Sequence, residues 1–107
     1  MNHERKRRLQ AHGWKVGSVQ EFLGLTDEEA ALIEIKLALS RELRKRREKR
    51  MTQRELAQKI QSSQPRIVRA ESGDGSVSTD LLVRALLATE ATPKDIGRVL
   101  SHVKLPL

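Results

Sequence analysis

Apolar residues recur along this chain at the three- and four-residue spacing of amphipathic helices. No stretch alternates with a period of two, so the pattern predicts no β-strand. The longest helical pattern starts with a capping-box sequence at residues 26–29 and continues to about Lys49 or Arg50. It carries one apolar stripe, formed by Leu32, Ile35, Leu39 and Leu43. The sequence therefore predicts an all-α fold in which one very short helix, opened by a capping box at residues 18–21 and ended by Gly24, precedes the long helix.

Two short helices are predicted directly after the long one. Thr52, followed three residues later by Glu55, forms a second capping box. The pattern then breaks, and Ser62 or Ser63 can cap a further helix, in which Pro65 is compatible only with the first turn. Helices this short need flanking helices to support them. Two short helices joined by a tight turn are typical of a helix-turn-helix, whose second helix enters the DNA major groove.

The second short helix has an apolar edge and a polar remainder. Ile67, together with Val68 or Ala70, forms the apolar edge. Three polar side chains are left free to project elsewhere: Gln64, Arg66 and Arg69. The edge can therefore face a core while the polar residues face a partner.

Two more helices complete the predicted fold. A fourth helix begins at Ser78 or Thr79, and its packing face is formed by Leu81, Leu82, Ala85 and Leu86. A fifth begins with Thr92 as N-cap and Pro93 at the first helical position, and it continues to about Ser101.

The two short helices resemble the lambda-repressor/Cro-like helix-turn-helix family, often labelled XRE. The resemblance lies in the run Thr52-Gln53-x-Glu55-Leu56-Ala57-x-Lys59-Ile60, followed by Ser63-Gln64-x-x-Ile67 and Glu71. It implies a compact five-helix DNA-binding domain, which we place at residues 26–107. Residues 1–25 are then a basic, partly flexible extension that can bind a partner. Gln61 departs from the family, which usually has glycine in the turn, and a left-handed conformation there costs about 1 kcal/mol.

The positive charge of the chain is concentrated immediately before this motif. The net charge is +7, and residues 41–54 carry eight Lys and Arg against two acids. Residues 26–40 carry one Lys and four acids. Phosphates would lie against the basic segment if the motif docks on DNA. The alternative is a solvated basic helix end, because cations favour a helix C-terminus.

The resemblance places the second short helix against base edges, with Gln64, Arg66 and Arg69 as the reading residues. Arginine offers a bidentate donor pair to guanine, and glutamine can both donate to and accept from adenine. For Arg69, an ion pair with Glu71 or Glu55 is the alternative, although capping and orienting roles are expected for both acids. Contacts to the DNA backbone are expected from seven further residues: Thr52, Gln53, Ser62, Ser63, Arg46, Arg47 and Arg50.

Several functional classes find no support in the sequence. There is no cysteine, the three histidines are isolated, and there is neither a glycine-rich phosphate loop nor metal-ligand spacing. We therefore expect no enzyme activity, no cofactor and no metal. The longest apolar run is too short to span a bilayer, and the basic amino terminus has no hydrophobic segment behind it. A cytoplasmic location follows as the expectation.

The whole chain resembles small HigA-like antitoxins of type II toxin–antitoxin operons. The resemblance implies that the protein represses its own operon and neutralises a RelE/HigB-like, messenger-RNA-cleaving toxin through a segment outside the motif. The expected anchors in that segment are Trp14, Val16, Val19, Phe22 and Leu23. Alternatively, Trp14 and Phe22 pack onto the long helix, and the protein is a stand-alone or phage-type regulator without a toxin partner. An RNA-binding role ranks lower, because the chain lacks surface aromatics that stack on bases.

A domain of this size contacts about half of a typical operator, so a homodimer on a palindromic site is expected. Two surfaces are candidates for the dimer contact. One is the carboxyl-terminal helix with the apolar tail Leu105-Pro106-Leu107. The other is the side of the long helix that carries Ile33 and Leu37, which the main stripe does not need.

Overall fold

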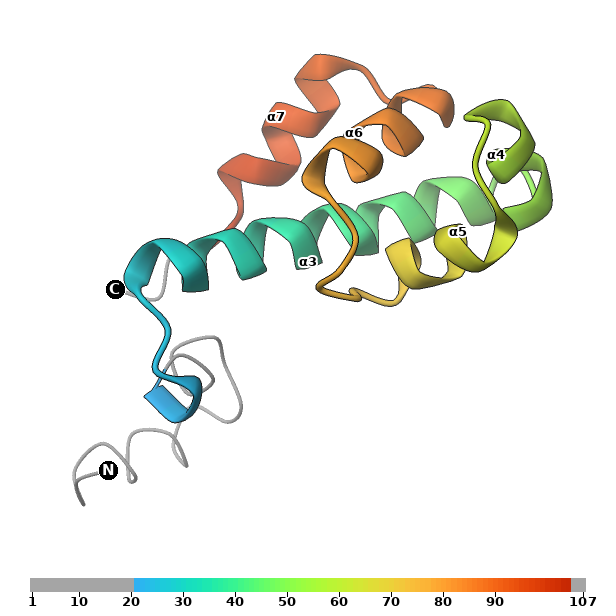
Figure 1. Cartoon of the computed structure of the whole chain (residues 1–107). Helices are drawn as coiled ribbons and strands as arrows, with labels where there is room; N and C mark the ends of the chain where they lie inside the picture. Colours follow the sequence, from blue (N-terminus) through green and yellow to red (C-terminus); the bar gives the residue numbers. More distant parts are fainter. Residues whose placement is uncertain (1–20, 105–107) are drawn as a thin grey trace. The chain divides into compact units, whose positions relative to one another are not determined.

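Residues 21–104 of the chain are described by a computed structural model. Over these residues the protein is all-α, as the sequence predicted, and no strand is present among them (Figure 1). A helical turn at residues 21–23 precedes five helices: α3 (Asp27–Glu48), α4 (Gln53–Lys59), α5 (Gln64–Glu71), α6 (Thr79–Ala88) and α7 (Pro93–Ser101). The expected anchors Trp14, Val16 and Val19 lie outside the described residues, as does the tail from Leu105 to Leu107.

Each helix begins at the capping residue that the sequence pattern indicated. At the start of α3, the Thr26 hydroxyl accepts from the Glu29 amide (3.1 Å), and Glu29 Oε1 accepts from the Thr26 amide (2.9 Å). Thr52 and Glu55 form the same reciprocal pair at α4. The remaining N-caps are Ser63 for α5, Ser78 for α6 and Thr92 for α7. These local contacts fix where the helices start before any tertiary packing is considered.

The capping carboxylates are stabilised in their charged form. The backbone amide of the cap residue, and secondly its hydroxyl, lower the pKa of Glu29, Glu55 and Asp95. Because these pKa values are lowered by folding, the associated stability is complete above the ordinary values of 4.5 for glutamate and 3.8 for aspartate. It is lost as the pH falls through the lowered values.

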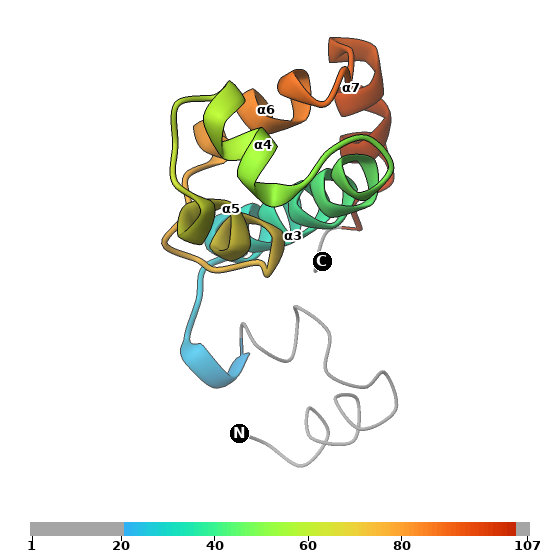
Figure 2. The same ribbon diagram turned by 90° about the vertical axis from the view of Figure 1, so that its right-hand side faces the viewer.

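Residues 35–103 form one compact unit with an aliphatic core. Each helix of the unit faces that core (Figure 2). The largest fully buried apolar side chains come from α3, α4, α5 and α6: Leu39, Leu43, Leu56, Ile67, Leu82 and Leu86. Ile96 and Val99 of α7 pack against the cluster without being fully buried. The short helices α4 and α5 are thus held by their neighbours, as their length requires.

The predicted apolar stripe of the long helix is only partly buried. Leu39 and Leu43 are core residues and Ile35 packs at the core edge, but Leu32 is 50% exposed. The expectation for Leu32 was therefore wrong. The core cluster of residues 35–103 contains no residue of α3 before Ile35, so Leu32 is not part of that packing.

The turn between α4 and α5 contains the left-handed residue that the sequence suggested. Gln61 has φ = 54°, and the next amide, that of Ser62, donates to the Ala57 carbonyl (2.8 Å). Arg84 of α6 adds a hydrogen bond from Nη2 to the Ile60 carbonyl (3.4 Å). The turn is therefore closed by one local and one tertiary hydrogen bond, which hold Gln61 in a conformation that glycine adopts more easily.

Replacing the turn residue by glycine should stabilise the protein. For Gln61→Gly we expect a gain of about 0.5–1 kcal/mol in the free energy of unfolding, because the left-handed strain is removed. The matched control is Gln58→Gly in α4, which should lose about 0.5–1 kcal/mol by adding backbone freedom to a helix. Urea unfolding measures both changes. A loss of stability in Gln61→Gly would show that the strain is not significant.

Candidate nucleic-acid interface

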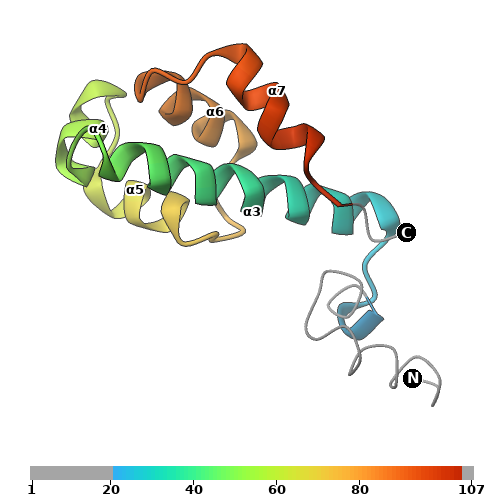
Figure 3. The same ribbon diagram turned by 180° about the vertical axis from the view of Figure 1, so that it is seen from behind.

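The helices α4 and α5 pack against each other at the carboxyl end of α3 (Figure 3). Ser63 caps α5 with a hydrogen bond from the Arg66 amide to its hydroxyl (3.4 Å), and Pro65 occupies the first turn. Three residues of α5 are buried: Ile67, Ala70 and Glu71. The other side of the helix faces solvent, so α5 is presented as an exposed ridge on the compact unit.

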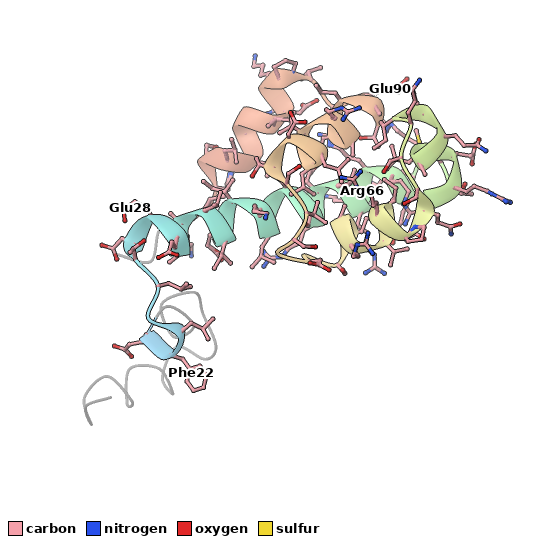
Figure 4. All side chains as sticks on the ribbon, in the orientation of Figure 1. Phe22, Glu28, Arg66 and Glu90 are labelled. Atoms are coloured by element: carbon pink, nitrogen blue, oxygen red, sulfur yellow. The ribbon has the colours of Figure 1, made fainter. Side chains whose placement is uncertain are left out.

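The exposed side of α5 carries all three residues predicted to read bases. A helix turns by about 100° per residue. Pro65 and Arg69 therefore lie nearly opposite the buried side, with Gln64 and Val68 on one flank and Arg66 on the other. All five are exposed, and Arg66 is labelled in Figure 4. The helix can thus offer Arg69 at its centre and a different polar side chain on each flank.

Val68 is a surface residue that the sequence pattern left undecided. The apolar edge could have been formed by Val68 or by Ala70, and the structure selects Ala70, which is fully buried. Val68 is 45% exposed. The three- to four-residue spacing of Ile67, Ala70 and Glu71 was the available signal, since it leaves Val68 on another side of the helix. An exposed branched side chain there is suited to contact a thymine methyl group.

Glu71 connects three segments of the motif through its carboxylate. It accepts from Arg47 of α3 in a bidentate pair, Nε to Oε2 at 2.6 Å and Nη2 to Oε1 at 2.9 Å. Gln53 of α4 donates from Nε2 to the same Oε1 (3.1 Å), and Arg47 Nη1 also donates to the Met51 carbonyl (3.3 Å). The side chains of Arg47 and Glu71 are only 13% and 4% exposed. The hydrogen bond to Glu71 raises the pKa of Arg47, so the guanidinium stays charged.

The acids considered as partners of Arg69 are engaged elsewhere. Glu71 binds Arg47 and Gln53, and Glu55 caps α4. Both acids therefore have the structural roles that were expected. Within the described part of the chain, neither Arg66 nor Arg69 forms an ion pair with a carboxylate. Their guanidinium groups are thus available to an external ligand.

The three arginines expected to contact phosphate are each paired with an acid of the chain itself. Arg46 binds Glu42 (2.7 Å) and lies 3.7 Å from Asp95, and Arg47 is held by Glu71. Arg50 Nε lies 3.5 Å from Glu90 Oε2 in an exposed pair, and Glu90 is labelled in Figure 4. An exposed pair is weak and can be exchanged for a phosphate, but the buried pair of Arg47 cannot be opened cheaply. Of the three arginines, Arg50 is therefore the one whose surroundings are compatible with a phosphate contact.

The four uncharged backbone-contact candidates differ in their exposure. Thr52 and Ser63 are exposed caps, and Gln53 is half-buried against Glu71. The Ser62 hydroxyl is buried and has no hydrogen-bond partner among the described residues. In this conformation Ser62 therefore does not present its hydroxyl to a phosphate, contrary to the expectation from its position in the turn.

Comparison with known families agrees with this geometry. A family model described as "Helix-turn-helix" matches residues 41–96, which is just over half of the chain. The chain belongs to the lambda-repressor/Cro-like helix-turn-helix family. No curated protein and no solved structure matches it. The helix-turn-helix assignment makes the protein a DNA-binding transcriptional regulator, with α5 in the place of the recognition helix.

The helix-turn-helix match starts in the second half of α3 and ends in the first turn of α7. Residues 21–40 lie outside it. Between residues 21 and 104 no group of three or more His, Cys, Asp or Glu could hold a metal ion. None of the helices described in that range is both long and apolar enough to cross a membrane.

Removing the Glu71 carboxylate should strongly destabilise the helix-turn-helix unit. For Glu71→Ala we expect a loss of about 3–5 kcal/mol, because the Arg47 charge is left buried and unpaired. Glu48→Ala is the matched control, since its pair with Arg44 is more than half exposed on both sides and should contribute less than about 1 kcal/mol. The double change Arg47→Met with Glu71→Leu should recover most of the loss. Urea unfolding at neutral pH measures the free energy of unfolding of each variant. Equal losses in Glu71→Ala and Glu48→Ala would contradict the structural role assigned to the Arg47–Glu71 pair.

Proposed function

We propose that this protein is a sequence-specific transcriptional repressor that reads its operator with α5. The observation that supports this most directly is the division of α5 into two sides. Ile67, Ala70 and Glu71 hold the helix on its scaffold, whereas Arg66 and Arg69 stay exposed and form no ion pair within the described residues. A rigidly held helix with exposed bidentate donors is the arrangement that direct readout of base edges requires.

Each exposed residue of α5 has a distinct base preference in this proposal. Arg69 and Arg66 offer paired donors to guanine, and Gln64 offers a donor and an acceptor to adenine. Val68 contacts a thymine methyl group. Backbone contacts come from Thr52, Gln53, Ser63 and Arg50, while Arg46 and Arg47 act through the scaffold.

The proposal includes a homodimer on a palindromic operator, because one recognition helix reads only one half-site. The carboxyl-terminal helix supports the dimer contact. Helix α7 fully buries none of its residues, and Leu100 is 40% exposed. Leu100 follows Ile96 by four residues and lies at the edge of the same apolar side, so its exposed part extends that side toward a second copy.

The readout is tested by Gln64→Ala combined with Arg69→Ala. We expect the variant to lose discrimination between the DNA upstream of its own reading frame and a scrambled duplex, at about 1–3 kcal/mol for each bidentate contact. Fluorescence anisotropy across a salt series measures this, and the salt slope should change little, because both residues are assigned to bases and not to phosphates. The urea midpoint should not change, because both side chains are exposed.

Lys94→Ala controls for the lost positive charge in that experiment. Lys94 is exposed on α7, and α7 lies apart from α5 in all three ribbon views (Figures 1, 2 and 3). This control should keep the discrimination of the wild type. If the double variant of α5 also keeps it, the assigned readout is wrong.

We further propose that the protein is the antitoxin of a type II toxin–antitoxin system and represses its own operon. The proposal is supported by the resemblance to HigA-like antitoxins and by the exposure of the two described anchors, Phe22 (73%) and Leu23 (60%). The partner would be a RelE/HigB-like toxin, whereas a stand-alone or phage-type regulator would have none.

Co-expression with the product of the adjacent reading frame tests the antitoxin role. The full chain should restore growth to cells that express a short, basic, RelE-like product of that frame. A variant that lacks residues 1–25 should bind the operator but fail to restore growth, because the anchors have been removed. Restored growth with the truncated variant would refute these anchors.

A further inference from the structure

Residues 21–34 carry a charge opposite to that of the rest of the chain. This segment holds five acids and no Lys or Arg, whereas the other 93 residues hold all 21 Lys and Arg and nine acids. The local net charge is −5, against +12 for the remainder. A fold that needs basic residues to approach DNA thus concentrates negative charge in one short segment.

Helix capping explains part of this negative charge but not all of it. Asp27, Glu28 and Glu29 stand in the first turn of α3, where acids stabilise the helix dipole, and Glu29 closes the capping box. Glu34 lies beyond the first turn and has no such role. The capping effect also does not account for the apolar side chains that accompany these acids.

The three most exposed large apolar residues of the described chain all belong to this segment. Phe22 is 73% exposed, Leu23 60% and Leu32 50%. None of them contributes to the core of the helix-turn-helix unit, and all lie outside residues 41–96 of the family match. Neither the fold nor the reading of DNA therefore requires them to be apolar, and their exposure is typical of a protein-binding surface.

The charge of the segment identifies its occupant by exclusion. Duplex DNA and anionic lipid surfaces are repelled by the exposed acids of this segment, among them Glu28. A cationic protein surface is attracted by them, and apolar pockets on that surface can receive Phe22, Leu23 and Leu32. An enzyme that cleaves messenger RNA must itself attract a polyanion, so its surface is of this cationic kind.

We infer that residues 21–34 are the docking segment for a basic protein partner. Phe22, Leu23 and Leu32 anchor the partner. The acids, mainly Glu28 and Glu34, attract it electrostatically and so speed its association. The inference rests on the proposed antitoxin function, and it adds Leu32, the acids and the charge of the partner. It also separates the two ligands by charge, since the basic residues of the helix-turn-helix unit serve DNA.

Two matched pairs of single substitutions test the segment in the full chain. Glu28→Lys is compared with Asp80→Lys, because both acids are exposed in the first turn of a helix. Leu32→Ala is compared with Leu87→Ala, because these leucines are 50% and 47% exposed on helices. Stopped-flow binding to the purified product of the adjacent reading frame gives both rate constants, and operator affinity is measured in parallel.

Glu28→Lys should slow association by about tenfold at low salt, and the effect should vanish at high salt. Leu32→Ala should speed dissociation by about tenfold or more. Both control variants should bind the partner as the wild type does. Operator affinity should be the same for Glu28→Lys as for Asp80→Lys, and the same for Leu32→Ala as for Leu87→Ala.

The possible failures are distinguishable. If the wild type binds the partner and the segment variants behave like their controls, the docking segment is wrong while the antitoxin proposal stands. If the wild type does not bind, both are wrong, and the operator measurement still decides the repressor proposal. If the segment variants change only the self-association of the free chain, the segment contacts a second copy and the inference is overturned.

Discussion

The buried pair between Arg47 and Glu71 is the interaction on which the DNA-binding unit depends. It joins the long helix to the recognition helix, and Gln53 ties the intervening helix to the same carboxylate. The helices α4 and α5 have 7 and 8 residues, which is too short for independent stability. A bidentate ion pair fixes their direction as well as their distance, which aliphatic packing around Ile67 alone would not do.

The chain distributes its charges so that only part of the basic surface remains open. Arg46 and Arg47 are held by acids that come from α3, α5 and α7, whereas the pair between Arg50 and Glu90 is exposed and weak. Arg66 and Arg69 have no such partner among the described residues. The positive potential near α5 is thus carried by side chains that can reorient onto a ligand. Charges that stabilise the fold and charges offered to DNA are separated by burial, although they are mixed in the sequence.

The elements and their boundaries could be read from the sequence because local interactions determine them. Thr26, Thr52, Ser63, Ser78 and Thr92 each cap a helix through contacts within three residues, and these contacts exist whatever the chain does elsewhere. The left-handed turn followed from the same kind of reasoning. The exposed positions of α5 could be anticipated for the same reason, since the spacing of its buried residues is a local property.

The tertiary structure decided what depends on contacts between distant residues. The sequence could not show that Glu71 would pair with Arg47 and so make it unavailable to DNA, because the two residues lie 24 positions apart. It could not show that Leu32 is left out of the core cluster, because membership of that cluster depends on contacts with the other helices. Local interactions in the sequence therefore determined where the helices form and indicated DNA as the ligand. Packing between distant residues determined which basic and apolar side chains remain exposed to bind a ligand.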